Sequence, residues 1–258
     1  MPMQAATDSK WVAPYHRRNA AAAVRLFCFP YAGGGASVFV RSLAQMTPSI
    51  EACPVQPPGR ENRLSEPCLT SVAEVASAAA GALRPYFDKD FAVFGHSLGA
   101  LFGYELLQIL RQSGGPSARH LIVSAHRAPH IPLSHPATWQ LPDLEFKQRI
   151  EELNGTPKEV LEHPELQALM LPLIRADFRL DETYSPAPGH HALDCPITVI
   201  GGTRDKEVPE SHLREWRAWT NKRFDLKMIE GDHFFILTKS SRLVAIITDA
   251  LRAEGCPG

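Results

Sequence analysis

The sequence predicts an α/β fold, with a mostly parallel central sheet and helices on both of its faces. Six short runs of apolar and β-branched residues have the length of buried strands. Between them lie segments whose apolar residues recur three and four positions apart, the spacing of an amphipathic helix. Because parallel strands need long crossover connections, and right-handed crossovers pack best, this alternation favours such a sheet.

The expected elements follow one another along the chain. The strands are expected at residues 25–30, 51–56, 91–95, 120–125, 196–202 and 225–230. The helical patterns between and after them cover residues 38–46, 72–83, 98–110, 211–219 and 243–251. Every strand except the fourth therefore leads directly into a helix that can cross back over the sheet.

Residues 128–192 interrupt this alternation. They contain no convincing strand, frequent prolines and two helical patterns, at residues 143–153 and 164–180. We interpret the segment as a helical insertion. An additional packing layer is the plainer interpretation, but a position between two strands of the sheet favours a lid over a pocket.

The length of 258 residues allows one large domain with an insertion. Residues 1–22 are polar, end in consecutive alanines and have no repeating apolar face. We therefore expect a loosely held lead-in, followed by the folded domain over residues 23–258. The N-terminus lacks the charged start and apolar core of a secretory signal, which favours a cytoplasmic location.

Composition and charge exclude several classes of protein. Hydrophobic residues make up 44% of the chain and charged residues 21%, which is typical of a globular protein. With 27 Lys and Arg against 28 Asp and Glu, no basic excess can neutralise nucleic acid. No apolar run approaches the roughly 20 residues that span a bilayer. Five cysteines without a C-x-x-C motif argue against a disulfide framework or a zinc ribbon.

The strongest signal for chemistry is the segment Gly95-His96-Ser97-Leu98-Gly99. An apolar strand pattern precedes it and a helical pattern follows it. In this context G-x-S-x-G forms a tight turn that exposes the serine hydroxyl at a helix N-terminus. The alternative is a glycine-rich turn in which Ser97 only caps the helix.

A serine hydroxyl becomes a nucleophile only when a base removes its proton, so a histidine and an orienting carboxylate are needed. With this turn they follow in the order Ser, Asp, His. Asp205 stands shortly after the strand pattern at 196–202, and His233 after the pattern at 225–230. The three loops should therefore meet at one edge of the sheet. Asp232 adjoins His233 and would have to fold back to reach its ring, so we favour Asp205.

The other notable histidines have different interpretations. His96 lies inside the turn, where we expect it to pack or hydrogen-bond beside Ser97 and not to act as the base. His126 ends a strand pattern and could line the pocket, although a structural role is the safer interpretation. His190 and His191 resemble a metal pair, but adjacent histidines point apart in an extended chain and no further ligand stands at a suitable spacing. We expect both on the surface of the lid.

Attack on a carbonyl places negative charge on its oxygen, which a backbone N–H group can stabilise by roughly 3 kcal/mol. With this type of turn, one donor is the residue after the nucleophile, Leu98. The second should come from the loop at residues 29–35, whose glycines allow a close approach. Such a loop could instead hold a phosphate, but it lacks the G-x-G-x-x-G spacing and a G-K-[ST] motif.

Together, the motifs resemble those of the type II thioesterases of polyketide and nonribosomal peptide synthesis, which are stand-alone α/β-hydrolases. The resemblance runs from about residue 25 to 251. It rests on the order and spacing of RLFCFPYAGGGASVF, QPPGRENRLSEP, VFGHSLGALFGYEL, PLIRADFRLDETY, GGTRDKEVP and GDHFFI. The chain departs from the family at Tyr31, where many relatives have histidine, and in its Pro-rich insertion, which affects the expected chain-length preference.

The resemblance implies roles for individual residues. The nucleophile falls on Ser97, the acid on Asp205 and the base on His233, and the oxyanion donors are the backbone N–H groups of Leu98 and Ala32. The insertion becomes a lid that shapes an acyl chamber. A 4'-phosphopantetheine arm enters it from a docked acyl or peptidyl carrier protein. We expect no cofactor, no metal ion and a monomer.

Four residues are expected to contact the acyl group. Tyr31 and His96 belong to the motifs around the nucleophile, and Met170 and Phe178 belong to the helical pattern of the insertion. Apolar residues at helical spacing can equally form the ordinary core of a lid.

The function that we predict is hydrolysis of carrier-bound acyl thioesters, with the removal of misprimed or stalled acyl groups as the role that the resemblance implies. A carboxylester hydrolase acting on small free esters would use the same triad without a carrier protein. A non-catalytic carrier-binding module is the alternative from another class. Cationic contacts to the carrier could come from four arginines, although loop arginines are more often simply solvated: Arg17, Arg18, Arg60 and Arg63.

Overall fold

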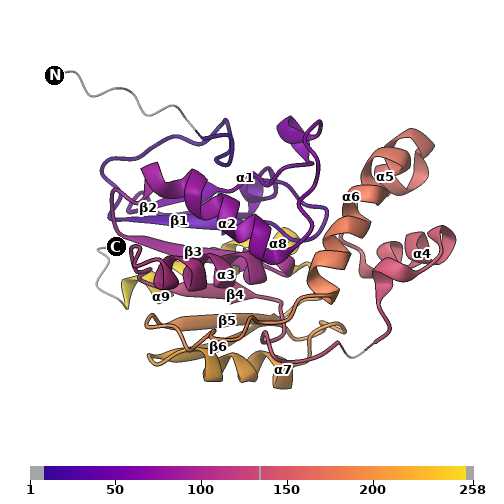
Figure 1. Ribbon diagram of the computed structural model, residues 1–258. Helices are drawn as coiled ribbons and strands as arrows, with labels where there is room; N and C mark the ends of the chain where they lie inside the picture. The colour runs from indigo at the N-terminus through magenta and orange to yellow at the C-terminus, as the bar shows by residue number, and fades with distance from the viewer. Residues whose placement is uncertain (1–8, 134, 254–258) are drawn as a thin grey trace.

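A six-stranded sheet lies at the centre of the protein, with its strands in the order β2-β1-β3-β4-β5-β6. The computed structural model, drawn in Figure 1, describes residues 9–133 and 135–253. All pairings between neighbouring strands are parallel. The predicted fold class is confirmed, because helical crossovers connect the parallel strands.

Each predicted strand is present. The strands are β1 (Val24–Phe29), β2 (Ile50–Pro54), β3 (Phe91–His96), β4 (Leu121–Ser124), β5 (Ile197–Gly202) and β6 (Phe224–Ile229). The helices around the sheet are α1 (Val38–Ser42), α2 (Val72–Leu83), α3 (Leu98–Gln112), α7 (Glu210–Arg214), α8 (Phe235–Thr238) and α9 (Ser240–Arg252). Short 3₁₀ turns are η1 (Glu61–Arg63), η2 (Arg84–Tyr86), η3 (Thr138–Gln140) and η4 (Glu215–Trp219). No helix in the described part of the chain is long and apolar enough to cross a membrane.

Both faces of the sheet are buried, which explains why its strands read as continuous apolar runs. In β1, Phe27 and Phe29 belong to the core shared with α2 and α3, whereas Leu26 and Cys28 belong to the core shared with α9. Figure 1 shows α2 and α3 on the face turned toward the viewer. All residues of β1, β3, β4 and β5 are buried.

The register of the central strands brings their carboxyl ends level. Phe29 at the end of β1 pairs with Gly95 of β3, and His96 pairs with Ser124 at the end of β4. The residue that follows β3 therefore stands between the loops that leave β1 and β4.

The insertion between β4 and β5 is helical, as the sequence predicts. Its helices are α4 (Asp143–Leu153), α5 (Lys158–Glu162) and α6 (Pro164–Glu182), and its described residues include no strand. The sequence does not predict α5, because five residues are too few to show a helical period. The three helices lie beyond the carboxyl ends of the strands (Figure 1) and share a small apolar core around Phe146, Ile150 and Ile174.

The N-terminal segment is better anchored than the sequence predicts. Of the loosely held lead-in expected over residues 1–22, residues 1–8 lie outside the described residues. Trp11 and Val12 are buried, and Val12 forms an antiparallel bridge with Val55. The expectation is therefore wrong for the described part of this segment. Two neighbouring apolar residues produce no period, so the sequence pattern gives no sign of their packing.

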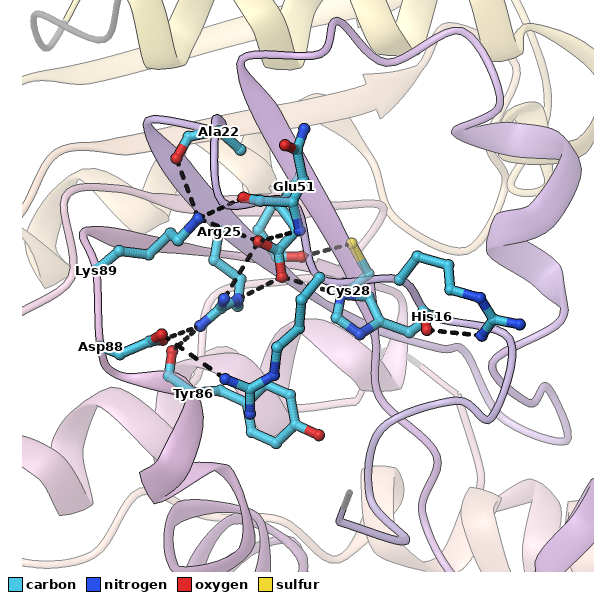
Figure 2. A network of polar contacts seen from close by, with 12 residues as sticks. His16, Ala22, Arg25, Cys28, Glu51, Tyr86, Asp88 and Lys89 are labelled. Carbon is cyan, nitrogen blue, oxygen red and sulfur yellow. Dashed lines mark hydrogen bonds and ion pairs between the residues drawn. The ribbon is translucent and has the colours of Figure 1, made fainter. Parts of the chain in front are cut away.

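A buried charge network also holds this segment against the edge of the sheet (Figure 2). The Glu51 carboxylate accepts hydrogen bonds from the Arg25 guanidinium at 2.6 and 3.2 Å. It also accepts from the Asn19 backbone N–H at 3.1 Å and the Lys89 ammonium at 3.2 Å, and it lies 3.0 Å from His16 Nε2. Arg25 and Glu51 are 1% and 3% exposed. Loss of Glu51 would leave the buried Arg25 guanidinium with the half-exposed Asp88 as its remaining carboxylate partner.

Replacing Glu51 by Gln should destabilise the protein by about 3–5 kcal/mol, because the buried Arg25 guanidinium loses its buried counter-charge and keeps only the half-exposed Asp88. Burial opposes ionisation of Glu51, but the hydrogen bond from Arg25 outweighs it and the pKa of Glu51 is lowered. Its carboxylate therefore stabilises the fold above the unfolded-state pKa of about 4.3. This stabilisation is lost as the pH falls towards the lower folded-state pKa. The difference in the free energy of unfolding between wild type and variant should therefore shrink as the pH falls. Urea unfolding at several pH values measures this difference.

Asp90→Asn is the matched control. It removes an ion pair with Arg119 whose side chains are 51% and 52% exposed, and it should cost less than about 1 kcal/mol. An equally small loss for Glu51→Gln would show that the buried network contributes nothing special to stability.

Candidate active site

Ser97 is held in a tight turn between β3 and α3. Its φ of 52° and ψ of −126° are strained for a residue with a side chain. Its backbone N–H donates to the Ser124 carbonyl at 2.7 Å. A Cβ at Gly95 would lie 2.1 Å from the Gly99 carbonyl oxygen, and a Cβ at Gly99 would lie 2.1 Å from the Phe29 carbonyl oxygen. The two glycines therefore let β1, β3 and α3 approach closely enough to expose the serine at the edge of the sheet.

Three side chains that the sequence singles out meet at this edge. His233 follows β6, and its Nε2 lies 3.0 Å from Ser97 Oγ. Asp205 follows β5, and its Oδ2 lies 2.8 Å from His233 Nδ1. When Nδ1–H donates to the carboxylate, Nε2 is left as an acceptor for the serine proton. The arrangement can therefore activate the hydroxyl as a nucleophile.

Asp205 is fixed by the backbone and shielded from solvent. Its Oδ1 accepts hydrogen bonds from the N–H groups of Glu207 at 2.8 Å and Val208 at 3.2 Å, and its side chain is fully buried. Burial opposes a charge on His233, but the hydrogen bond to Asp205 and its negative charge outweigh this and raise the pKa of His233. The competitor Asp232 is exposed and accepts a backbone N–H two residues along the chain.

Both residues expected to stabilise an oxyanion lie next to the serine. Leu98 is the first residue of α3, where a backbone N–H has no partner within the helix. Ala32 lines the same cavity as Ser97, and no acceptor among the described residues meets its backbone N–H. The partial positive charge of the helix N-terminus adds to the attraction for an anion at this point.

A cavity of about 860 Å³, including its open mouth, leads to Ser97. Part of its apolar wall comes from the insertion and consists of Leu133, Ile150, Leu153, Ile174 and Phe178, and the rest includes Tyr31, Val208 and Phe234. Its polar wall includes His126, Arg127, Asp181, Glu207 and His212. The cavity can therefore hold an apolar chain with its reactive end beside the serine.

The four expected substrate contacts do not all reach this cavity. Tyr31 and Phe178 line it. His96 does not, because it is fully buried behind the serine, with its Nδ1 2.8 Å from Ser124 Oγ. Met170 packs into the core of the insertion, on a turn of α6 beyond the residues that line the cavity. The structure thus corrects the expectation that His96 and Met170 contact an acyl chain.

The side chains of His126 and His190 have protein partners. His126 lines the cavity, as one of its two interpretations predicts, and its Nε2 lies 2.9 Å from Asp181 Oδ1. His190 is not on the lid surface, since its side chain is 5% exposed and pairs with Glu105 at 3.5 Å, while His191 is exposed. No group of three or more His, Cys, Asp or Glu side chains is placed to hold a metal ion within residues 9–133 and 135–253.

Asp177 is not among the residues predicted from the sequence; it lies on α6 and is fully buried. It accepts hydrogen bonds from the Gly33 backbone N–H at 2.7 Å and from the Arg60 guanidinium at 2.8 and 3.0 Å. The available signal is its spacing: Asp177 stands three residues from both Ile174 and Leu180, on the buried face of the helix. A carboxylate at such a position indicates a buried partner.

The chain is similar to known thioesterases over most of its length. The family model described as a thioesterase domain matches residues 24–251. The gramicidin S biosynthesis protein GrsT of Aneurinibacillus migulanus is 39% identical over 239 residues, covering 93% of this chain and 93% of GrsT. The thioesterase PikA5 of Streptomyces venezuelae is 38% identical over 242 residues, covering 93% of this chain and 85% of PikA5. The solved structure of the type II thioesterase BorB, from the borrelidin biosynthetic cluster, has a TM-score of 0.84 at 33% identity, covering 93% of this chain and 97% of BorB.

Replacing Gly99 by Ala should destabilise the protein by about 2–3 kcal/mol, because the new Cβ would overlap the Phe29 carbonyl and force the backbone apart. Gly81→Ala in α2 is the control, since a Cβ there meets nothing within 4 Å. Its better helix propensity should stabilise the protein by up to about 1 kcal/mol. Chemical unfolding of both variants measures the difference. A Gly99→Ala protein as stable as wild type would contradict the close approach of α3 to β1.

Proposed function

The chain belongs to the thioesterase family, and from this premise we propose that Ser97, His233 and Asp205 form the catalytic triad of a stand-alone type II thioesterase. The enzyme is a serine hydrolase that cleaves acyl thioesters. The observation that supports the assignment of the triad is the pair of hydrogen bonds that runs from Ser97 through His233 to Asp205, at the end of a cavity with an apolar wall.

In the first half of the reaction, His233 Nε2 takes the proton of the Ser97 hydroxyl while Oγ attacks the thioester carbonyl carbon. The carbonyl oxygen becomes negatively charged and accepts hydrogen bonds from the N–H groups of Leu98 and Ala32. Asp205 keeps the imidazole oriented and stabilises its positive charge. The C–S bond then breaks, the sulfur leaves with the proton from His233, and the acyl group remains as an ester of Ser97.

Water completes the second half of the reaction. His233 takes a proton from the water molecule, whose oxygen attacks the acyl carbon. The bond to Ser97 Oγ breaks, the serine recovers its proton from His233, and a free acid leaves. We propose that the reaction needs no cofactor and one copy of the chain, because the triad side chains and water supply every atom and proton.

We further propose that the acyl group arrives on the 4'-phosphopantetheine arm of an acyl or peptidyl carrier protein. The similarity to GrsT and BorB, whose names refer to gramicidin S and borrelidin biosynthesis, supports a synthase of polyketides or nonribosomal peptides as the source. A thiol with a pKa of about 8.5 leaves more readily than an alcohol, so modest acid catalysis suffices. The physiological role that we propose is the removal of misprimed or stalled acyl groups.

The four arginines considered for carrier docking do not support a common docking surface. Arg60 and Arg63 are 3% and 6% exposed and form hydrogen bonds inside the protein. Arg17 and Arg18 are exposed, but Arg18 lies over the ring of Tyr86, which precedes β3. That places it near the amino ends of the strands, opposite the catalytic edge. Arg18, Arg60 and Arg63 are therefore not proposed as carrier contacts.

Replacing Ser97 by Ala should lower the release of acyl groups from carrier proteins by about 10³-fold or more, because no nucleophile remains. Mass spectrometry of a panel of acylated carrier proteins, before and after treatment, measures this release and the preferred chain length together. The wild-type enzyme should cleave the carrier thioester faster than a free ester of the same acid. A clear preference for the ester would favour a carboxylester hydrolase, and undiminished release by the variant would rule out Ser97 as the nucleophile.

The rate should rise with pH through the pKa of His233, because only the neutral imidazole accepts the serine proton, and this pKa lies above its ordinary value of 6.5. Asp205→Asn removes a carboxylate that favours the charged imidazole. The midpoint of the kcat/KM profile should therefore move to lower pH, and the plateau should fall by about 10³-fold or more. Asp232→Asn is the control and should leave the profile unchanged. A midpoint for Asp205→Asn equal to or above that of wild type would contradict the proposed pairing.

A further inference from the structure

The lid helix α6 contacts the loop that carries Ala32. The buried Asp177 accepts the Gly33 backbone N–H at 2.7 Å. One turn earlier on the helix, Ile174 packs so closely that a Cβ at Gly33 would lie 2.7 Å from its Cγ1. Gly33 has a φ of 75°, a conformation that favours glycine. The peptide unit beside Ala32 is therefore held by both an apolar contact and a hydrogen bond from the insertion.

Arg60 joins the same contact from a third segment of the chain. Its two terminal nitrogens donate to the two carboxylate oxygens of Asp177 at 2.8 and 3.0 Å. This bidentate pairing fixes the orientation of the guanidinium relative to the carboxylate. One of these nitrogens also donates to the Gly34 carbonyl at 3.1 Å. The guanidinium thus ties the glycine loop to α6.

Other side chains hold the far end of the glycine loop. The Ala36 N–H donates to Gln56 Oε1 at 2.6 Å, and the Ser37 N–H donates to Glu61 Oε1 at 3.1 Å. These contacts lie three or more residues beyond Gly33 and come from the segment after β2. At the near end of the loop, where Ala32 stands, the Gly34 N–H donates to the Tyr31 carbonyl at 2.9 Å and closes a turn, and Asp177 is the side chain that ties this turn to the insertion.

We propose that Asp177 is a positioning residue: through Gly33 it sets the direction of the Ala32 N–H towards the oxyanion. The inference rests on the proposed function of this site. A buried ion pair is poor evidence for stability, because an apolar pair of similar volume often stabilises a fold as well or better. What an apolar side chain at position 177 cannot supply is an acceptor for the half-buried Gly33 N–H, which would then lose its protein partner.

The test compares two double variants that both lack the ion pair. Arg60→Met with Asp177→Asn keeps an oxygen acceptor for Gly33, whereas Arg60→Met with Asp177→Leu has a similar volume and keeps none. Both remove both buried charges, so neither leaves an unpaired one. We expect kcat of the Leu variant to lie about 10-fold or more below that of the Asn variant, because the oxyanion charge exists only in the transition state. KM should differ by less than about twofold.

Binding of an alkylboronic acid, which forms a tetrahedral adduct with the serine, provides a readout without turnover. Its affinity should fall by the same factor as kcat, while the affinity for the product acid should stay constant. A purely structural role for Asp177 would change unfolding but not the ratio of these two affinities. Equal kcat and equal boronate affinity in the two double variants would overturn the proposal.

The substrates are an N-acetylcysteamine thioester and a p-nitrophenyl ester of the same acid, since both pass through an oxyanion. If the wild-type enzyme failed to release acyl groups from carrier proteins, the proposed function would fail while this comparison would still stand. Should circular dichroism show that the Leu variant is unfolded, Arg60→Met with Asp177→Ala takes its place and is compared with the same Asn variant, because alanine also supplies no acceptor for the Gly33 N–H. A joint fall of kcat and boronate affinity would support the proposal, and full retention of both would overturn it.

Discussion

The close packing of α3 against β1 and β3 determines where the nucleophile can stand. Glycine at positions 95 and 99 lets three backbones approach within a distance that no Cβ tolerates, and Ser97 takes a positive φ as a result. This turn puts the hydroxyl at the N-terminus of a helix and at the carboxyl edge of the sheet. The loops after β5 and β6 lie at the same edge because the strands are parallel. Asp205 and His233 are therefore placed beside Ser97 by the sheet itself.

The insertion takes part in the catalytic edge as well as covering it. Through Asp177, α6 is bound to the glycine loop by a buried charge pair and a backbone hydrogen bond. α4 contacts the acid loop through the ion pair of Arg149 with Glu207. The loop after α4 rests on Phe234, since a Cβ at Gly155 would overlap that ring. Any movement of the insertion must therefore leave the contact of α6 in place or disturb the loop that carries Ala32 with it.

The sequence predicts those parts of the molecule that a local pattern specifies. The strands are buried on both faces and read as apolar runs, and the G-x-S-x-G turn with its following Asp and His predicts which loops meet. Features that depend on contacts between distant segments are not predicted. Trp11 is buried although its neighbours in the sequence show no apolar periodicity. His190 pairs with Glu105, which lies on α3, far away in the sequence. Met170 has the same helical spacing as Ile174 and Phe178 but does not line the cavity. Asp177 is visible only as a charge on an apolar face, with no indication of its partner.

In the proposed mechanism the acyl group passes through an ester of Ser97. Rapid acid quenching of the enzyme during turnover of an acyl-pantetheine thioester, followed by mass spectrometry of its proteolytic peptides, detects such an ester. We expect a mass increase equal to the acyl group on the peptide that contains Ser97. Hydrolysis accompanied by an acyl group on a different residue would contradict it.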